Sequence, residues 1–461
     1  MKISRKLILE AIKGTTEDLT SIPLSRAIIL LSIPMILEMS MESLFAVVDA
    51  FFVAKLGEAA LTTVGLTESV MFLVYSLAIG LATAATAMVA RRVGEKDIPS
   101  ANIAASQAIL IAVAISVLVG LGGGIFAEDI LSLMGADAEV LEIGTNYTRI
   151  MFGGNVVIML LFLLNGIFRG TGNATLALYT LVLCNGINIV LDPCLILGLG
   201  PFPKLGVTGA AVATNIGRGI GVAFQLYLLF SGKGVLHLGK QHFAPIADLI
   251  RRLLKVASGG AGQYVISSAS WVFLMRIISN FGTEVVAGYT ITIRVIIFAI
   301  LPAFGMANAA ATLVGQNLGA NRPDRAEQAA WRTGLYCTIF FVGVSILSYF
   351  FAPLIIGIFG QGEAATEAGI ISLRIICAGY ITFGYGMVLS QSLNGAGDTR
   401  TPTFINFLAF WLVQIPLAYS LAVLLDVGPT GVYWAILITE TVFAAICIFV
   451  FRRGNWKETK I

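Results

Sequence analysis

Long apolar stretches recur along the whole chain, with only short polar segments between them. A helix that crosses a membrane needs about 20 largely apolar residues. The sequence contains twelve such stretches, expected at 27–53, 61–91, 103–127, 145–168, 174–199, 208–231, 253–280, 286–316, 329–358, 368–393, 402–426 and 430–451. The basic, weakly amphipathic segment 2–19 precedes them, and we expect it to form an interfacial helix. The pattern predicts an all-α membrane protein with twelve transmembrane helices.

The composition supports this class of protein. Of 461 residues, 57% are hydrophobic and only 12% are charged, whereas soluble domains contain about a quarter charged residues. This balance excludes a cytosolic enzyme, a secreted disulfide scaffold, a disordered chain and a nucleic-acid binder. The five cysteines lie in apolar runs without metal or redox spacing, and both histidines lie in one basic segment. We therefore expect neither histidine-based catalysis nor a resident cofactor.

The basic residues predict how the chain crosses the membrane. On one side lie the basic residues of the N-terminal segment, of the 2–3, 4–5, 8–9 and 10–11 connections, of the segment near 240 and of the C-terminal tail. The opposite side has only Lys55 and Lys204. Because cytoplasmic loops carry the excess of Lys and Arg, we expect a multi-pass protein of the cytoplasmic membrane with both termini in the cytoplasm.

An internal repeat runs through the chain at one constant offset of 225 residues. The segment GLATAATAMV (80–89) aligns without a gap with GMANAAATLV (305–314). Further matched pairs are Gly57 and Gly282, Gly94 and Gly319, Gly144 and Gly369, Arg149 and Arg374, Gly170 and Gly395, and Thr214 and Thr439. An offset that persists across several loops indicates a duplicated unit.

The repeat predicts two six-helix bundles. We expect an N-terminal segment at 1–26, an N-terminal lobe at 27–231, a cytoplasmic linker at 232–252, a C-terminal lobe at 253–451 and a tail at 452–461. Six helices are an even number, so both lobes insert in the same direction as parallel repeats. A central cavity between such lobes, opening alternately to each side, is typical of a transporter.

The loops resemble those of one transporter family. VARRVGEKDIPSANIAASQA (89–108) and VGQNLGANRPDRAEQAAWRT (314–333) occupy matched positions, as do FRGTGNATLAL (168–178) and LNGAGDTRTPT (393–403). The first span reads IPMILEMSMESLFAVVDAFFVAKLG (33–57). Together these segments resemble the multidrug and toxic compound extrusion (MATE) family, in particular the prokaryotic branch whose coupling acids lie in the N-terminal lobe.

The resemblance implies a secondary active transporter that exports amphipathic, often cationic drugs or metabolites by antiport with H⁺, Na⁺ or both. From the composition and the absence of catalytic motifs we expect no enzyme activity and no nucleic-acid partner, and we expect a monomer surrounded by membrane lipid. The alternative is a flippase for lipid-linked precursors, from a superfamily that shares the architecture. A flippase for anionic headgroups would line its cavity with several Arg or Lys, whereas the intramembrane arginines here are expected mostly near outer ends, where they snorkel or pair with acids.

Two spans of the first half carry ionisable residues, and such residues inside a membrane indicate functional sites. Asp49 on the first span and Asp192 on the fifth are expected at similar depth in the outer part of the membrane. Two such carboxylates can share a proton or a cation. We expect Asn188, Tyr147 and Thr214 as neighbours, and a possible Na⁺ site at Asp49, Asp192 and Asn188. The alternative is that the aspartates accept hydrogen bonds from helix ends.

Four further polar residues and one proline are candidates for other roles. Glu38 and Glu42 share a helix face with Asp49, and they either attract a cationic drug or line a wet crevice. Glu68 and Asn165 are weaker candidates for lining the substrate cavity. Pro34 lies in the middle of the first span and removes a backbone hydrogen bond there. This predicts either a hinge that bends during transport or a static kink.

The same offset predicts that the two halves are functionally unequal. The positions that match Asp49, Asp192 and Asn188 are Leu274, Leu417 and Val413, which neither exchange a proton nor bind a cation. Glu440 is the candidate acid of the second half, and it has no evident acidic partner there.

Overall fold

The protein is described here by a computed structural model that covers residues 5–14, 17–360 and 362–461. Every regular element among these residues is a helix. This confirms the all-α prediction, and helix α1 (Arg5–Lys13) lies within the expected interfacial segment.

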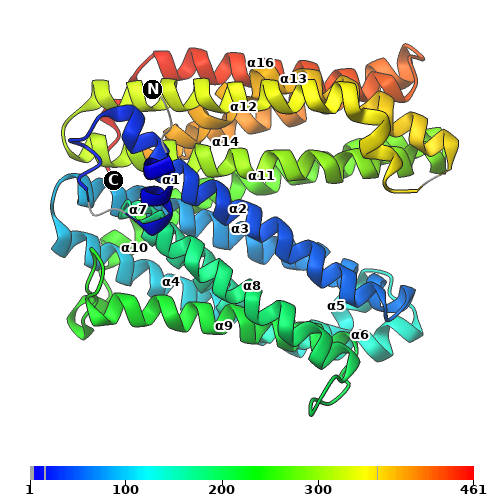
Figure 1. The fold of residues 1–461 in the computed structure, drawn as a ribbon, viewed down its shortest axis with the longest axis horizontal. Helices are drawn as coiled ribbons and strands as arrows, with labels where there is room; N and C mark the ends of the chain where they lie inside the picture. Colours follow the sequence, from blue (N-terminus) through cyan, green and yellow to red (C-terminus); the bar gives the residue numbers. More distant parts are fainter. Residues whose placement is uncertain (1–4, 15–16, 361) are drawn as a thin grey trace. The chain divides into compact units, whose positions relative to one another are not determined.

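In the described residues of the first half, nine α-helices or short helical turns follow α1 (Figure 1). They are α2 (Leu24–Ala54), α3 (Glu58–Gly94), α4 (Ile98–Ile125), α5 (Ala127–Leu133), α6 (Ala138–Gly153), α7 (Asn155–Gly170), α8 (Ala174–Leu197), α9 (Val207–Ser231) and the 3₁₀ turn η1 (Lys240–Phe243).

The second half repeats this order with local differences. It contains α10 (Ala247–Ile278), the 3₁₀ turn η2 (Ser279–Phe281), α11 (Thr283–Gly319), α12 (Pro323–Gly357), α13 (Glu363–Gly395), α14 (Arg400–Asn406), the π-helical segment η3 (Phe407–Gln414), α15 (Ile415–Tyr419), the π-helical segment η4 (Ser420–Leu424), α16 (Pro429–Arg452) and the 3₁₀ turn η5 (Asn455–Glu458).

Most of these helices are long and apolar enough to cross a membrane. Among the described residues ten pass this test, and the bent pair α6–α7 adds an eleventh. Helix α9 fills the remaining expected span with 25 residues. It contains Asn215, Arg218 and Gln225, whose polarity lowers its hydropathy. The helices therefore cover all twelve expected spans.

The span expected at 145–168 differs from a single helix. It is divided into α6 and α7, which meet at an angle of 43°. Gly153 and Gly154 stand at the break, and glycine weakens a helix because it has no side chain to restrict the backbone. A Cβ atom at Gly154 would lie 2.0 Å from the Asn215 Oδ1 atom. The bend therefore brings the α6–α7 backbone directly against α9.

The chain forms two compact units, and the first helix of each half is divided between them. The C-terminal unit contains Glu17–Ile36 and the described residues from Gly262 to Ile461, together with Arg5–Ala11. The N-terminal unit contains Leu37–Ala261 and a short piece of the N-terminal segment that begins at Ile12. Each unit thus contains the N-terminal part of the other half's first long helix.

Glycines allow the N-terminal part of each divided helix to pack closely within the other half's unit. In the C-terminal unit, Gly305 lies so close to α2 that a Cβ atom would be 2.6 Å from the Ile36 backbone nitrogen. In the N-terminal unit, Gly80 lies equally close to α10, with a Cβ atom placed 2.7 Å from the Ala261 nitrogen. These residues are matched by the 225-residue offset. Close approach of membrane helices depends on such small residues, so the repeat extends to individual packing contacts.

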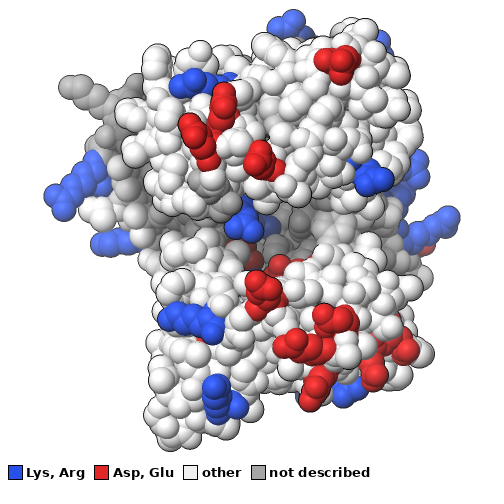
Figure 2. All heavy atoms as spheres, turned by 90° about the vertical axis from the view of Figure 1, so that its right-hand side faces the viewer, with Lys and Arg blue, Asp and Glu red and all other residues white. Residues whose placement is uncertain are grey.

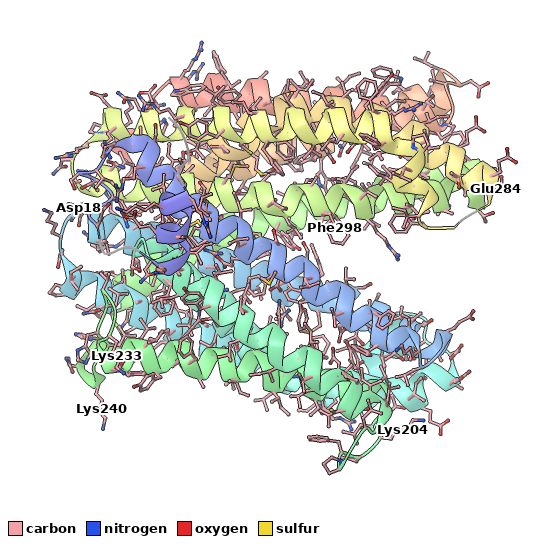
Figure 3. The ribbon with its side chains drawn as sticks, in the orientation of Figure 1. Asp18, Lys204, Lys233, Lys240, Glu284 and Phe298 are labelled. Atoms are coloured by element: carbon pink, nitrogen blue, oxygen red, sulfur yellow. The ribbon has the colours of Figure 1, made fainter. Side chains whose placement is uncertain are left out.

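The segment between α9 and α10 is fastened to the N-terminal unit. The Gln107 side chain on α4 donates to the His242 and Ala244 carbonyls and accepts from the Ile246 amide. The Asn102 side chain accepts from the His237 amide at 3.0 Å. Lys233 and Lys240 of this segment lie at the end of the unit opposite to Lys204, in the α8–α9 loop (Figure 3).

An acidic surface covers α5 and the start of α6. Its exposed members are Glu128, Asp129, Asp137, Glu139 and Glu142. The face of the molecule in Figure 2 shows acidic side chains gathered at this end of the helices. Like Lys204, this surface lies at the end opposite to the α9–α10 segment.

Candidate functional site

The N-terminal unit brings the two expected aspartates together. Asp49 on α2 is 9% exposed and Asp192 on α8 is completely buried. The carboxylates are close enough to repel each other when both are charged. Tyr147 on α6 is also buried and interacts electrostatically with both aspartates. Three helices far apart in sequence thus converge on this pair.

Hydrogen bonding leaves several oxygens of this group unused. The Asn188 Nδ2 atom donates to the Asp192 Oδ1 atom at 3.1 Å. The Asp49 Oδ1, Asp192 Oδ2 and Asn188 Oδ1 atoms are buried and accept no hydrogen bond from any described residue. Leaving a buried acceptor unsatisfied costs about 1–3 kcal/mol, and more for a charged group. A proton or a small cation would satisfy these oxygens.

The donor set is suited to a hard cation rather than a transition metal. No three His, Cys, Asp or Glu side chains in the described part of the chain are placed to hold a metal ion. Two carboxylates and an amide oxygen are instead the oxygen ligands that hard cations prefer. The group can equally exchange a proton, because two adjacent carboxylates disfavour joint ionisation.

A ladder of small residues holds α9 against α8 at this level. A Cβ atom at Gly217 would lie 3.4 Å from the Asn188 Cβ atom, and one at Gly209 would lie 2.4 Å from the Leu195 carbonyl. Thr214, which is 7% exposed, stands about one turn from Gly217 on the same side of α9. The antiparallel packing therefore places Thr214 at the depth of Asp192.

Glu38 and Glu42 each carry an ion pair. The Arg169 Nη1 atom on α7 lies 2.9 Å from the Glu38 Oε1 atom, and both residues are buried. The Arg218 Nη2 atom on α9 lies 3.0 Å from the Glu42 Oε1 atom. The Asn185 side chain on α8 also donates to the Met41 carbonyl at 2.7 Å. Three polar contacts thus fasten one stretch of α2 to three other helices.

Pairing with an acid was one of the two arrangements expected for intramembrane arginines, and Arg218 has it, although most of these arginines were expected near the outer ends of the spans. Arg169 was expected as a cytoplasmic loop charge, yet it ends α7 and is only 8% exposed. Arg218 is 4% exposed and lies in the middle of α9. Neither arginine was predicted to be a site residue. The available signal was an uncompensated acid on α2 for each of them, because buried charges need partners.

The other candidates lie in different surroundings. Asn165 on α7 is buried, and its Oδ1 atom accepts from the Gln225 Nε2 atom at 2.7 Å. Glu68 on α3 is exposed and makes no ion pair with a described residue. Pro34 lies inside α2, which continues through it, two residues before the helix passes from one unit to the other.

The chain is similar in sequence and in fold to known membrane proteins. A family model described as MatE matches residues 34–194 and 260–420, one stretch in each half. "Probable multidrug resistance protein YoeA" of Bacillus subtilis is 27% identical over 441 residues, covering 95% of each chain. A protein of Shewanella oneidensis named "FAD transporter" is 26% identical, covering 94% of this chain and 96% of its own. The crystal structure of MATE in the straight conformation superposes with a TM-score of 0.90 at 27% identity, covering 96% of this chain and 98% of the other.

Proposed function

Because the chain belongs to the MatE family, whose members are multi-pass membrane transporters, we propose that it exports amphipathic, often cationic small molecules in exchange for H⁺, Na⁺ or both. The observation that carries this proposal is the buried group of Asp49, Asp192 and Asn188, with oxygens that accept no hydrogen bond. Buried carboxylates without an ion-pair partner are costly inside a membrane, so a cation or proton that enters and leaves explains their presence.

In this proposal the coupling cation and the drug use different side chains. Asp49, Asp192 and Asn188 hold the proton or the Na⁺ ion, with Tyr147 and Thr214 beside them. Glu38 and Glu42 are already neutralised by Arg169 and Arg218. Glu68 is exposed without an ion pair to a described residue, so it is the acid best suited to attract a cationic drug.

The charge pattern supports a location in the cytoplasmic membrane with both termini inside the cell. Alternating access between the two lobes would then expose the drug site to each side in turn. Pro34 is proposed as the hinge of α2, because it weakens the helix next to the point where the helix changes unit. We propose that the monomer is the working form, in contact with membrane lipid.

Transport of lipid-linked precursors is the less favoured alternative. The buried arginines Arg169 and Arg218 are each paired with a glutamate, so neither is free to bind an anionic headgroup. The names of the similar proteins, a multidrug resistance protein and an FAD transporter, support a soluble small molecule as cargo. A drug or an aromatic metabolite fits that range.

The proposal is tested by efflux from proteoliposomes under separately imposed proton and sodium gradients. Asp49→Asn and Asp192→Asn should each abolish gradient-driven efflux of a fluorescent cationic dye, because an amide neither ionises nor neutralises a cation. Glu440→Gln is the matched control, since it removes a buried carboxylate of the C-terminal unit, and efflux should persist. Efflux at the wild-type rate in either aspartate variant would contradict the assignment.

A further inference from the structure

Arg218 lies between two acids on one face of α2. Its Nη2 atom pairs with the Glu42 Oε1 atom at 3.0 Å, and its Cζ atom lies 4.6 Å from the centre of the Phe45 ring. Glu42, Phe45 and Asp49 are three and seven residues apart, so they share one helix face. With a rise of about 1.5 Å per residue, Glu42 and Asp49 stand roughly 10 Å apart along the axis, with Phe45 between them.

The guanidinium group therefore stands on the path between Glu42 and Asp49. Its electrostatic interactions extend to Asp49 and to Glu68. Three acids of the N-terminal unit thus interact electrostatically with the one guanidinium group of Arg218. The two carboxylates lie about two helical turns apart along α2, and the guanidinium over Phe45 is about one turn short of Asp49.

Both partners of this second pairing have unused hydrogen-bonding capacity. The Arg218 Nη1 atom is buried and donates to no described residue, and the Asp49 Oδ1 atom is buried and accepts from none. An unmade hydrogen bond between buried charged groups is expensive. Arg218 also has five donors in a planar fork, so it can turn toward one carboxylate while keeping the Phe45 ring as a platform.

We propose that Arg218 is a tethered cation that moves between Glu42 and Asp49 and competes there with the coupling cation. The structure has Arg218 paired with Glu42, and we assign this pairing to the state in which a proton or Na⁺ occupies Asp49. When the coupling cation leaves, Arg218 moves to Asp49 and keeps the empty site neutral. Arg218 acts here as a positioning residue that sets the affinity for the cation, and this inference rests on the proposed coupling at Asp49.

A static ion pair that merely ties α2 to α9 would behave differently. In a static pair each charge would act on the cation through space, so the shifts of the two single variants would be opposite and would cancel in the double variant. In the exchange proposed here, Glu42 acts only through Arg218, so the two shifts do not cancel. Loss of Arg218 removes the competitor of the cation, whereas loss of Glu42 removes the alternative partner and leaves Arg218 at Asp49.

The test measures the concentration of the driving cation that gives half-maximal dye efflux from proteoliposomes. The cation is whichever of Na⁺ and H⁺ drives efflux by the wild type. Arg218→Gln should lower this concentration roughly tenfold and Glu42→Gln should raise it roughly tenfold, as a charge about one helical turn away requires at intermediate dielectric. The double variant E42Q/R218Q should match Arg218→Gln, because Glu42 has no effect without the arginine.

The outcomes separate the inference from the function on which it rests. Shifts of both single variants in one direction, no shift, or cancellation of the two shifts in the double variant would overturn the exchange while leaving Asp49 coupling intact. A wild type driven by neither gradient would overturn the proposed function and the exchange together. If Arg218→Gln alone fails to fold because it leaves Glu42 unpaired, the double variant has no uncompensated charge, and it must still shift opposite to Glu42→Gln.

Discussion

The Glu38–Arg169 contact and the Gln263–Asn394 contact occupy the same place in the two halves of the chain, since both residues of each pair are related by the 225-residue offset. In the N-terminal unit the contact is a buried ion pair with 2.9 Å between Nη1 and Oε1. In the C-terminal unit it is a reciprocal amide pair at 2.9 and 3.0 Å. The duplicated framework has kept the contact and changed its chemistry.

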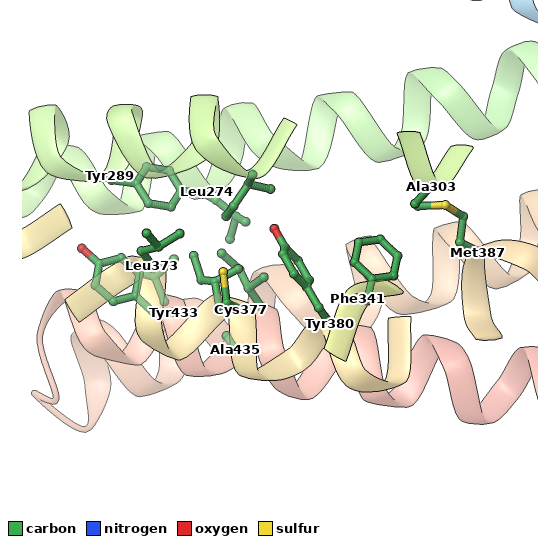
Figure 4. Close-up of a cluster of buried hydrophobic side chains, with 14 of the residues drawn as sticks. Leu274, Tyr289, Ala303, Phe341, Leu373, Cys377, Tyr380, Met387, Tyr433 and Ala435 are labelled. Atoms are coloured by element: carbon green, nitrogen blue, oxygen red, sulfur yellow. The ribbon is translucent and has the colours of Figure 1, made fainter. Parts of the chain in front are cut away.

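Other matched contacts follow the same division. The Asn155 side chain donates to the Ser116 carbonyl in the N-terminal unit, whereas their counterparts Tyr380 and Phe341 are aromatic rings 5.2 Å apart. Leu274, the counterpart of Asp49, is completely buried in the apolar cluster that contains these rings (Figure 4).

Other matched contacts are the same in both units. Arg149 donates to the Gly124 carbonyl, and its counterpart Arg374 donates to the Tyr349 carbonyl.

The buried ion pair of the N-terminal unit has a desolvation cost that the amide pair of the C-terminal unit avoids. Replacing a buried ion pair by neutral residues is often neutral or stabilising, and the C-terminal unit demonstrates that the framework does not require charge at this contact. The charges of the N-terminal unit are therefore better explained by function than by stability. We expect ion binding to change the N-terminal unit first, with the C-terminal unit comparatively fixed.

The largest expected loss of stability comes from substitutions in the matched pairs Glu38–Arg169 and Gln263–Asn394. Glu38→Gln should destabilise the protein by about 3–5 kcal/mol, because it leaves the buried Arg169 charge without a partner. Gln263→Leu in the other unit should cost only about 1–3 kcal/mol, the penalty of an unsatisfied neutral amide. Thermal unfolding in detergent measures both changes.

The double variant E38Q/R169N transplants the amide pair into the N-terminal unit. It should recover most of the stability lost in Glu38→Gln, since it removes the unpaired charge. An equal cost for Glu38→Gln and Gln263→Leu, or no recovery in the double variant, would mean that the charges are not what distinguishes the two units.

A smaller effect is expected from the helix prolines. Pro34→Ala restores a backbone hydrogen bond in α2 and favours the straight helix. It should therefore slow dye turnover by roughly tenfold, which corresponds to about 1.4 kcal/mol, while dye binding changes less. Pro302→Ala in α11 is the control, because it removes an internal helix proline of the C-terminal unit. Equal turnover in both variants would assign Pro34 to a static kink.

The smallest effect concerns the matched starts of α4 and α12. The Asp97 side chain caps α4 by accepting from the Ser100 amide at 3.1 Å. Its counterpart Arg322 makes no side-chain cap and instead donates to the Thr20 carbonyl at 2.7 Å. Asp97→Ala should cost about 1 kcal/mol of stability, measured by thermal unfolding at neutral pH.

The pH dependence of this cap has a definite sign. Hydrogen bonds from Ser100 hold the pKa of Asp97 below its usual value. The stabilisation is therefore complete above the ordinary pKa of an aspartate and is lost as the pH falls through the lowered value. The difference between the wild type and Asp97→Ala should shrink in acid, and a difference that grows there would contradict the cap.

The sequence predicted the spans and the repeat because these depend on local composition and on glycines at close approaches. The break at Gly153 and Gly154 was not predicted, since two glycines within an apolar run do not interrupt its hydropathy. The partner of Glu38 was also not predicted. Arg169 is 131 residues away, and only tertiary packing decides that this arginine turns inward rather than toward the α7–α8 loop. The roles of Asp49 and Asp192 remain predictions until the efflux test is made.

The division of α2 between the two units has a consequence for how the protein is made. The stretch Glu17–Ile36 leaves the ribosome early, yet the rest of its unit begins at Gly262. The N-terminal part of α2 therefore cannot complete its packing until most of the second half has been synthesised. Cutting the chain within 232–246 would yield two fragments that each lack part of a folding unit. Such fragments should accumulate only when produced together, so a protein that arose by duplication can no longer be separated into its original halves.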